Sequence, residues 1–198
     1  MTAVRHVAIF ASGAGSNARN LIQYFSNHPA IKCSLLVCNK TGAGAFAIAE
    51  EYGLPSRLIT RDDFQHPTEF LRMLEEYHIT DIVLAGFLWK VPASVIQAFP
   101  QHIYNIHPSL LPKYGGKGMY GHAVHEAVFH AHEQESGITI HLVNEHYDEG
   151  AVIAQIRTDV SDAKSPMEIE TRVRALEMAH FPSVIESVLM SDPGNDHA

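Results

Sequence analysis

Two polar side chains interrupt an apolar stretch of the chain, and their types suit acid–base or oxyanion chemistry. Asn105 and His107 lie two residues apart within Ile103–Leu111. On a strand, residues i and i+2 point to the same face, so the amide and the imidazole are expected to converge. Pro108 favours an extended backbone for His107, which predicts that the histidine ends a strand. Open α/β sheets bind ligands at that end. From these two residues alone, a buried histidine bonded to a backbone carbonyl is an equal alternative.

A glycine-rich turn near the start of the chain can hold a phosphate. Residues 12–16 read Ser-Gly-Ala-Gly-Ser, between an apolar run and apolar residues at helical spacing. Free backbone N–H groups at such a helix start bind phosphate. The Gly-x-Gly-x-x-Ala spacing from Gly13 also fits a dinucleotide motif, but the next strand ends in Asn39-Lys40, without the acid that holds a ribose. A simple phosphate site is therefore favoured over NAD, and a tight turn without a ligand stays open.

Alternating apolar patterns predict an α/β fold. Through the first 107 residues, apolar runs typical of strands alternate with segments of helical spacing, which predicts a parallel sheet covered on both faces. After residue 112 come a glycine-rich loop, a helix and two strands of period two joined by an acidic loop, an antiparallel hairpin. Predicted strands cover Arg5–Phe10, Ile31–Cys38, Pro55–Ile59, Ile82–Ala85, Ile103–His107, Ile138–Val143 and Ala151–Thr158. Predicted helices cover Asn17–Phe25, Gly44–Tyr52, Pro67–Tyr77, Pro92–Phe99, His122–His132 and Pro166–Leu189.

Composition and charge limit the classes of function. The 198 residues, 46% hydrophobic and 18% charged, suit one globular domain over 1–190, with a polar tail over 191–198 that is expected to be disordered. The net charge of −8 argues against general binding to nucleic acid or membranes. No stretch reaches the length of a membrane span and no signal peptide is recognised, so we expect a cytoplasmic protein. The 14 histidines match no zincin or Cys-pair ligand spacing, and no metal is expected.

Four motifs together resemble the glycinamide ribonucleotide formyltransferases, the folate-dependent enzymes of purine biosynthesis. They are Ser12–Asn17, Leu84–Phe87, Asn105–Tyr114 and the Asp148-x-Gly element, and they follow in order over nearly the whole chain. The resemblance implies a Rossmann-like three-layer α/β/α fold whose mixed sheet is parallel in its N-terminal half and antiparallel in its C-terminal strands. It also implies formyl transfer from the cosubstrate 10-formyltetrahydrofolate to the amine of glycinamide ribonucleotide. Small molecules are then the expected partners, and the protein is expected to be a monomer or a homodimer.

The resemblance also implies roles for single residues. Asn105 and His107 would donate hydrogen bonds to the oxyanion of a tetrahedral intermediate. Asp148 resembles the family's catalytic aspartate and would pair with His107 or act through a water; an acidic turn residue is the alternative. The residues expected to bind the ribonucleotide are Gly13, Gly15, Ser16, Asn17, Arg174 and Glu177. Those expected to bind the folate are Phe87, Leu88, Trp89, Val91, Asn144, Glu145, His146 and Tyr147.

The chain departs from the family where the folate tail would bind. Trp89 stands where many relatives have an arginine, and Pro67 stands where some relatives have another. The loop Gly115–Gly121 is several residues longer than usual. Arg174 and Glu177 can equally form an ordinary surface ion pair. Three other functions stay open: a hydrolase that deformylates the folate, a formyltransferase for another amino sugar nucleotide, and a nucleotide-binding module without catalysis.

Overall fold

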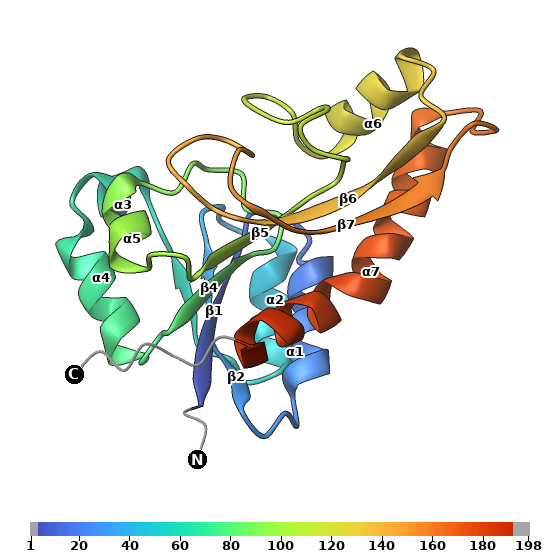
Figure 1. The fold of residues 1–198 in the computed structure, drawn as a ribbon. Helices are drawn as coiled ribbons and strands as arrows, with labels where there is room; N and C mark the ends of the chain where they lie inside the picture. Colours follow the sequence, from blue (N-terminus) through green and yellow to red (C-terminus); the bar gives the residue numbers. More distant parts are fainter. Residues whose placement is uncertain (1–3, 192–198) are drawn as a thin grey trace. The chain divides into compact units, whose positions relative to one another are not determined.

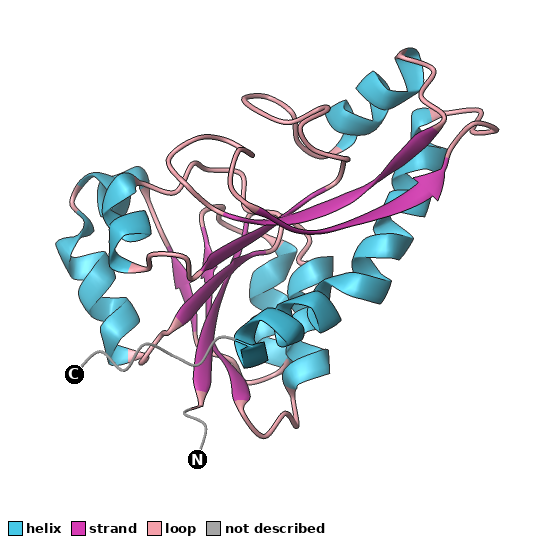
Figure 2. Cartoon of the chain, in the orientation of Figure 1, coloured by secondary structure: helices cyan, strands magenta, loops and turns pink. Residues whose placement is uncertain are grey.

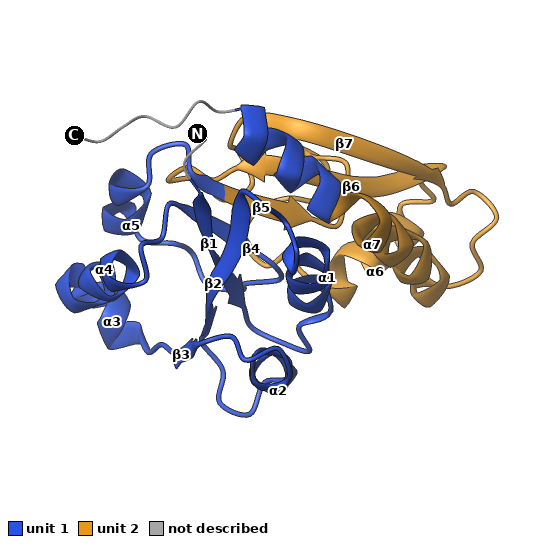
Figure 3. Cartoon of the chain, turned by 90° about the horizontal axis from the view of Figure 1, so that it is seen from below, with its two compact units in different colours: residues 1–103, 182–198 blue, residues 104–181 orange. Residues whose placement is uncertain are grey.

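Helices and strands alternate along the first half of the chain, and a hairpin follows (Figures 1 and 2). The structure is a computed structural model and describes residues 4–191. These residues form two compact units (Figure 3): unit 1 holds residues 4–103 and 182–191, and unit 2 holds residues 104–181. The predicted disordered tail, 191–198, lies outside the described residues except for Ser191, the last residue of helix α7 (Pro166–Ser191).

Unit 1 is built on four parallel strands in the order β3-β2-β1-β4. β1 (Arg5–Ala11) and β4 (Asp81–Leu84) are almost entirely buried, as expected for a parallel sheet with both faces covered. β2 (Ile31–Cys38) follows, and β3 (Ser56–Leu58) is a short strand whose three residues are all exposed. A short, exposed strand at this edge offers few unpaired groups to another chain.

Helices cover both faces of the sheet of unit 1 (Figure 3). α1 (Ser16–Phe25) and α2 (Gly44–Glu51) lie on one face, and α4 (Pro67–Glu76) and α5 (Ala93–Ala98) lie on the other. Each longer helix turns an apolar stripe inward, as its spacing predicts. Phe70 of α4, for example, packs edge-on against Phe10 of β1, with ring centroids 6.0 Å apart.

The sequence did not predict one helix of unit 1, α3 (Arg61–Gln65). Five residues are too few to show a helical period. A capping box starts the helix: the backbone N–H and the hydroxyl of Thr60 donate to the Asp63 carboxylate at 2.6 and 2.7 Å. The helix lies on the same side of the sheet as α4 and α5 (Figure 3).

Unit 2 holds the antiparallel strands. β5 (Ile103–His107) pairs with β6 (Glu135–Leu142), and β6 pairs with β7 (Val152–Asp159), so the predicted hairpin is present. β6 begins three residues before the predicted start because Gly137 allows a close approach to the Ile156 carbonyl, where a side chain would clash. The unit also contains α6 (His122–His130) and the first part of α7 (Pro166–Ser191).

The predicted fold class is confirmed. The seven strands of residues 4–191 make a mixed sheet, parallel in its N-terminal half and antiparallel in its C-terminal strands, with flanking helices. The single domain expected over 1–190 stays a prediction. Within the described part of the chain, no helix is both long enough and apolar enough to cross a membrane.

A buried ionic cluster lies at the start of β1 and β4 in unit 1. The guanidinium of Arg5 donates to both Asp81 oxygens at 2.8 and 2.9 Å, and the Asp81 side chain is fully buried. Thr80 Oγ1 donates to the same carboxylate at 2.6 Å, and His102 Nδ1 lies 3.1 Å from it. Burial opposes ionisation of Asp81, but the hydrogen bonds with His102, Arg5 and Thr80 outweigh it and hold its pKa below the ordinary value.

Candidate active site

β5 carries the two polar residues from which the predicted site starts. Both belong to unit 2; His107 is only 4% exposed and Asn105 is half-buried. The register of β5 against β6 sets Asn105 opposite His141, and Asn105 Nδ2 lies 3.1 Å from His141 Nε2. The backbone pairing therefore adds a second histidine to the predicted pair.

Hydrogen bonding fixes the tautomer of His141. Its Nδ1 lies 2.8 Å from the Leu142 carbonyl, which can only accept, so Nδ1 carries the proton. A neutral ring then offers a lone pair at Nε2, and the amide N–H of Asn105 donates to it. Burial, the largest cause, lowers the pKa of His141; the Leu142 carbonyl and the Asp148 charge act against it without reversing it. His141 therefore orients the Asn105 amide as a neutral acceptor.

His107 is held at both ring nitrogens. Nε2 lies 2.7 Å from the Tyr114 carbonyl, so this nitrogen is a donor. Nδ1 lies 3.5 Å from Asp148 Oδ2, which is the pairing predicted for these two residues. A second proton on Nδ1 makes the ring an imidazolium and gives the carboxylate a donor. Nε2 is thus bonded to the Tyr114 carbonyl, and Nδ1 faces the Asp148 carboxylate.

The glycine-rich loop after β5 holds Asp148 in place. The Gly116 N–H donates to Asp148 Oδ2 at 2.8 Å, and His141 Nε2 lies 3.7 Å from Asp148 Oδ1. A Cβ at Gly115 would lie 2.5 Å from Leu111 Cδ2 and 3.2 Å from Asp148 Cβ, so the approach needs glycine. Asp148 itself has φ = 56°, a left-handed conformation that aspartate tolerates better than most residues. The hydrogen bond from Gly116 is therefore the one short contact of this carboxylate, and both histidine rings lie farther away.

His141 is the residue of this cluster that the sequence reasoning missed. A weak signal exists, because the predicted strand at 138–143 carries two polar residues, Thr139 and His141, on one face. Both are buried, with Thr139 0% and His141 2% exposed. Without the register, nothing in the sequence sets this face opposite Asn105.

In unit 1, the predicted phosphate turn leads from β1 into α1. Gly15 caps α1 with φ = 81°, and a Cβ there would lie 2.7 Å from Ile48 Cδ1, so glycine is required for both reasons. Ser16 and Asn17 begin the helix, whose first N–H groups have no partner within the helix. Gly13 is exposed, with open space around its Cα.

The predicted folate residues of unit 1 follow β4 and lie beside this turn. Ser12 N donates to the Gly86 carbonyl at 3.1 Å, and Leu88 N donates to Ser12 Oγ at 2.8 Å. Phe87 and Val91 are buried at 8% and 3% exposure, whereas Leu88 is 49% exposed and Trp89 is half-buried. Leu88 and Trp89 therefore offer side-chain surface to a ligand.

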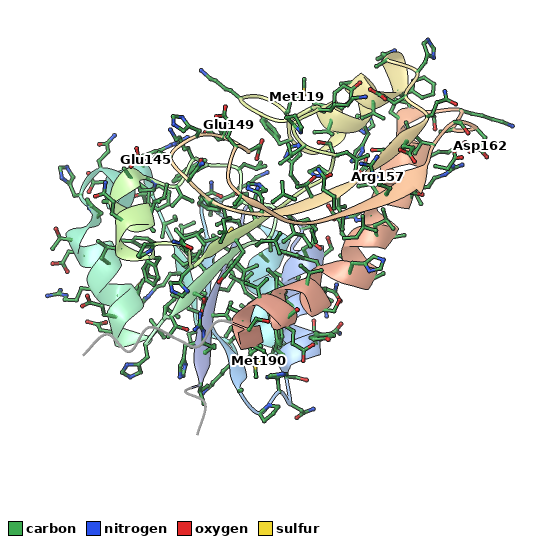
Figure 4. All side chains as sticks on the ribbon, in the orientation of Figure 1. Met119, Glu145, Glu149, Arg157, Asp162 and Met190 are labelled. Atoms are coloured by element: carbon green, nitrogen blue, oxygen red, sulfur yellow. The ribbon has the colours of Figure 1, made fainter. Side chains whose placement is uncertain are left out.

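The remaining predicted residues lie in unit 2. Asn144 begins the β6–β7 loop, where its side chain accepts from the His146 N–H at 2.9 Å. Glu145, His146 and Tyr147 are exposed; Figure 4 labels Glu145 on this loop and Met119 on the glycine-rich loop. On α7, Arg174 is exposed and Glu177 is half-buried, one turn apart. Among residues 4–191, no group of three or more His, Cys, Asp or Glu side chains is placed to hold a metal ion.

Comparison with known proteins identifies the family of the chain. A sequence model of the family described as "Formyl transferase" matches residues 5–185. The phosphoribosylglycinamide formyltransferase of Bacillus subtilis is 32% identical over 191 residues, which cover 94% of this chain and 95% of that protein. The chloroplastic phosphoribosylglycinamide formyltransferase of Arabidopsis thaliana is 37% identical over 190 residues, or 93% of this chain. The chain spans 65%, less than two thirds, of that protein's length.

A solved structure shows the same fold. The phosphoribosylglycinamide formyltransferase of Anaplasma phagocytophilum aligns with a TM-score of 0.85 and 27% identity, over 95% of this chain and 88% of that one. The sequence match runs through both units and includes the strand that carries Asn105 and His107. The chain therefore belongs to the formyl transferase family, and the relatives described above are phosphoribosylglycinamide formyltransferases.

Proposed function

We propose that this protein is a phosphoribosylglycinamide formyltransferase. It would transfer the formyl group of 10-formyltetrahydrofolate to the amine of 5-phosphoribosyl glycinamide, which yields formylglycinamide ribonucleotide and tetrahydrofolate in purine biosynthesis. The observation that carries the proposal is the convergence of Asn105, His107 and Asp148 in unit 2. An amide donor, an ionisable imidazole and a carboxylate are the groups that formyl transfer to an amine requires.

The proposed chemistry assigns a role to each of the three. The amine nitrogen attacks the formyl carbon, and the carbonyl oxygen becomes an oxyanion. The Asn105 amide and the His107 imidazolium would stabilise this oxyanion as hydrogen-bond donors, each worth a few kcal/mol in such sites. The bond from carbon to N10 of the folate then breaks. The amine would lose a proton to Asp148, directly or through a water. N10 of the folate would gain a proton from His107, the imidazole next to Asp148.

Binding is proposed at the residues that the sequence identified. Gly13, Gly15, Ser16 and Asn17 would hold the phosphate with backbone N–H groups at the start of α1. Arg174 and Glu177 would contact the ribonucleotide. The residues proposed to contact the folate are Phe87, Leu88, Trp89, Val91, Asn144, Glu145, His146 and Tyr147.

The proposal extends to the domain organisation, the partners and the cellular compartment of the protein. We infer a single formyltransferase domain over 1–190, small-molecule partners only, and a monomer or a homodimer. The net charge of −8 supports the absence of nucleic-acid binding. We infer that the protein acts in the cytoplasm.

One assay tests the proposal. Purified protein is incubated with 10-formyltetrahydrofolate, with and without glycinamide ribonucleotide, and both tetrahydrofolate and formylated product are measured. We expect folate release to require the ribonucleotide and to match product one to one. Release at equal rates in both mixtures would mean a hydrolase. Transfer to a different amino sugar nucleotide, with none to glycinamide ribonucleotide, would reassign the acceptor.

A further inference from the structure

The backbone carbonyl of Tyr114 in unit 2 holds one side of the His107 ring. It accepts from His107 Nε2 at 2.7 Å, and His107 is almost completely buried. Tyr114 has φ = 56°, a left-handed conformation that is strained for a residue with a bulky side chain. Such a conformation persists only where neighbouring contacts hold it. The orientation of this carbonyl therefore depends on the contacts of Tyr114.

Glu133 contacts Tyr114 and the residue before it. Glu133 lies between α6 and β6, where its N–H donates to the Val128 carbonyl at 3.3 Å. The Tyr114 hydroxyl donates to Glu133 Oε1 at 3.0 Å, and the Lys113 ammonium donates to the two carboxylate oxygens at 2.8 and 3.0 Å. The hydrogen bond from Lys113, and after it the one from Tyr114, lowers the pKa of Glu133. A charged carboxylate thus joins the end of α6 to the loop after β5.

The backbone on the N-terminal side of Tyr114 is held separately. Ser109 Oγ donates to the Lys113 carbonyl at 2.6 Å, and Ser109 is buried. Because a peptide group is planar, this bond fixes the plane between Lys113 and Tyr114, and rotation about the Cα of Tyr114 sets its carbonyl. The Lys113 side chain is 64% exposed, and exposed ion pairs contribute little. The hydrogen bond from the Tyr114 hydroxyl to Glu133 is therefore the contact that restricts this rotation.

We propose that Glu133 is a positioning residue for His107: it binds the Tyr114 hydroxyl, and the Tyr114 carbonyl then keeps a proton on His107 Nε2. The hydrogen bond at one ring nitrogen determines which nitrogen of a neutral histidine is protonated. Without the carbonyl, a neutral ring can place its proton on Nδ1, where the Asp148 carboxylate would accept it. The side of the ring that faces Asp148 would then be altered. The consequence for turnover rests on the proposed function.

Nitrogen NMR of the histidine rings tests the proposal without any substrate. The His107 signals are assigned by their loss in His107→Asn, and the ring shifts are measured at a pH where the ring is neutral. We expect the proton on Nε2 in the wild type and a mixture of both tautomers in Glu133→Ala. Glu133→Gln, whose amide oxygen still accepts from the Tyr114 hydroxyl, should keep most of the wild-type pattern. Unchanged His107 shifts in Glu133→Ala would overturn the inference.

A double-mutant cycle tests the path through the Tyr114 hydroxyl. Glu133→Ala should lower kcat about threefold to tenfold with little change in either KM, because the positioned ring acts in the chemical step. Tyr114→Phe should cause the same loss, and the double variant no more, because both changes break one hydrogen bond. Lys113→Met should lower kcat by at most about twofold. Losses that multiply in the double variant, or a loss in Lys113→Met equal to that in Glu133→Ala, would overturn the inference.

Glu135→Ala is the matched control. Glu135 lies two residues after Glu133 and pairs with Arg157 at 3.0 Å, so its loss removes the same charge and also breaks an ion pair. We expect the His107 shifts and kcat to stay unchanged, and thermal unfolding of each variant accompanies both measurements. Effects equal to those of Glu133→Ala would reduce the result to general electrostatics and overturn the inference.

The two measurements separate this inference from the proposed function. If the wild type transfers no formyl group but the His107 shifts depend on Glu133, the proposed function fails and the positioning of the ring stands. If transfer occurs and the shifts do not depend on Glu133, the inference is wrong and the function stands. A changed tautomer with an unchanged kcat would overturn the role of Glu133 in turnover.

Discussion

Asp81 in unit 1 and Asp148 in unit 2 both contact histidines, and the two carboxylates are held in different ways. Asp81 in unit 1 is fully buried and has four close contacts, two from Arg5, one from Thr80 and one with His102, at 2.6 to 3.1 Å. Asp148 in unit 2 has one hydrogen bond of 2.8 Å, from Gly116, and its two histidines lie at 3.5 and 3.7 Å. Its side chain is 11% exposed.

The difference in contacts indicates that Asp81 stabilises the fold, whereas Asp148 is suited to catalysis. Every lone pair of Asp81 is used, so protonation of this carboxylate breaks a buried network. Asp148 forms no short hydrogen bond with either histidine, whose ring nitrogens lie 3.5 and 3.7 Å away, so its carboxylate can still accept from a substrate. Catalytic hydrogen bonds are often long before the substrate binds. The comparison therefore assigns stability to the Asp81 cluster and turnover to the Asp148 cluster, and each can be tested by substitution.

The largest effect is expected from His107→Ala. Loss of the imidazole removes a hydrogen-bond donor to the oxyanion and the proposed proton donor to N10. We therefore expect kcat to fall about a thousandfold, which raises the activation free energy by about 4 kcal/mol. Steady-state kinetics with saturating substrates measure this change. His107→Asn, which can still donate to the Tyr114 carbonyl, keeps the fold while removing the titrating group. Near-normal turnover in either variant would remove His107 from the proposed mechanism.

Asp81→Asn should show the opposite pattern. The substitution leaves the buried Arg5 without its counter-charge, and the free energy of unfolding should fall by about 3 kcal/mol. Urea denaturation monitored by circular dichroism measures the loss. At a temperature where the variant stays folded, kcat should match the wild type. A large drop in kcat with unchanged stability would reverse the roles assigned to the two aspartates.

The pH dependence of stability provides an independent check on Asp81. Its pKa in the folded state lies below the ordinary value. The ionised carboxylate therefore stabilises the fold fully above its unfolded pKa of about 3.9, and this contribution disappears as the pH falls through the folded pKa. The difference in stability between the wild type and Asp81→Asn should be constant from pH 7 to about pH 5 and should shrink below about pH 4. A constant difference down to pH 2 would contradict the pairing.

Asp148→Asn should lower kcat by about a hundredfold, or about 2.7 kcal/mol, with little change in stability. The amide can still accept from Gly116 but cannot take a proton from the amine. Steady-state kinetics test the expected fall in kcat, and thermal unfolding of the same preparation tests the unchanged stability. A strong loss of stability would place Asp148 with Asp81, as a structural residue.

The fold and the polar pair on β5 follow from local patterns in the sequence. Buried strands of β1 and β4 appear as apolar runs, and Asn105 and His107 share a face because they are two residues apart on a strand. Such features depend on residues close in sequence, which explains why they could be predicted. The contribution of Asp148 rests on the family motif, because an acidic turn residue alone has a simpler explanation.

Contacts that depend on pairing between distant segments could not be predicted. Arg5 meets Asp81, 76 residues away, only because β1 and β4 are neighbours in a fixed register. His141 orients Asn105 for the same reason, through the register of β5 and β6. α3 was missed because five residues carry no measurable period, although the Thr60-x-x-Asp63 capping signal was present.

The smallest effect is expected from Gly115→Ala. This substitution tests whether kcat depends on the exact position of the Asp148 carboxylate. The new Cβ would meet the flexible end of Leu111 and, at 3.2 Å, the Cβ of Asp148, so the carboxylate must move by a few tenths of an ångström. Small displacements of a catalytic group reduce turnover, and kcat should fall about threefold to tenfold while stability changes little. Lys117→Ala, an exposed change in the same loop, is the control and should leave kcat unchanged. If Gly115→Ala turns over at the wild-type rate, the position of Asp148 is not critical. The contrast with Asp81 would then be one of burial alone.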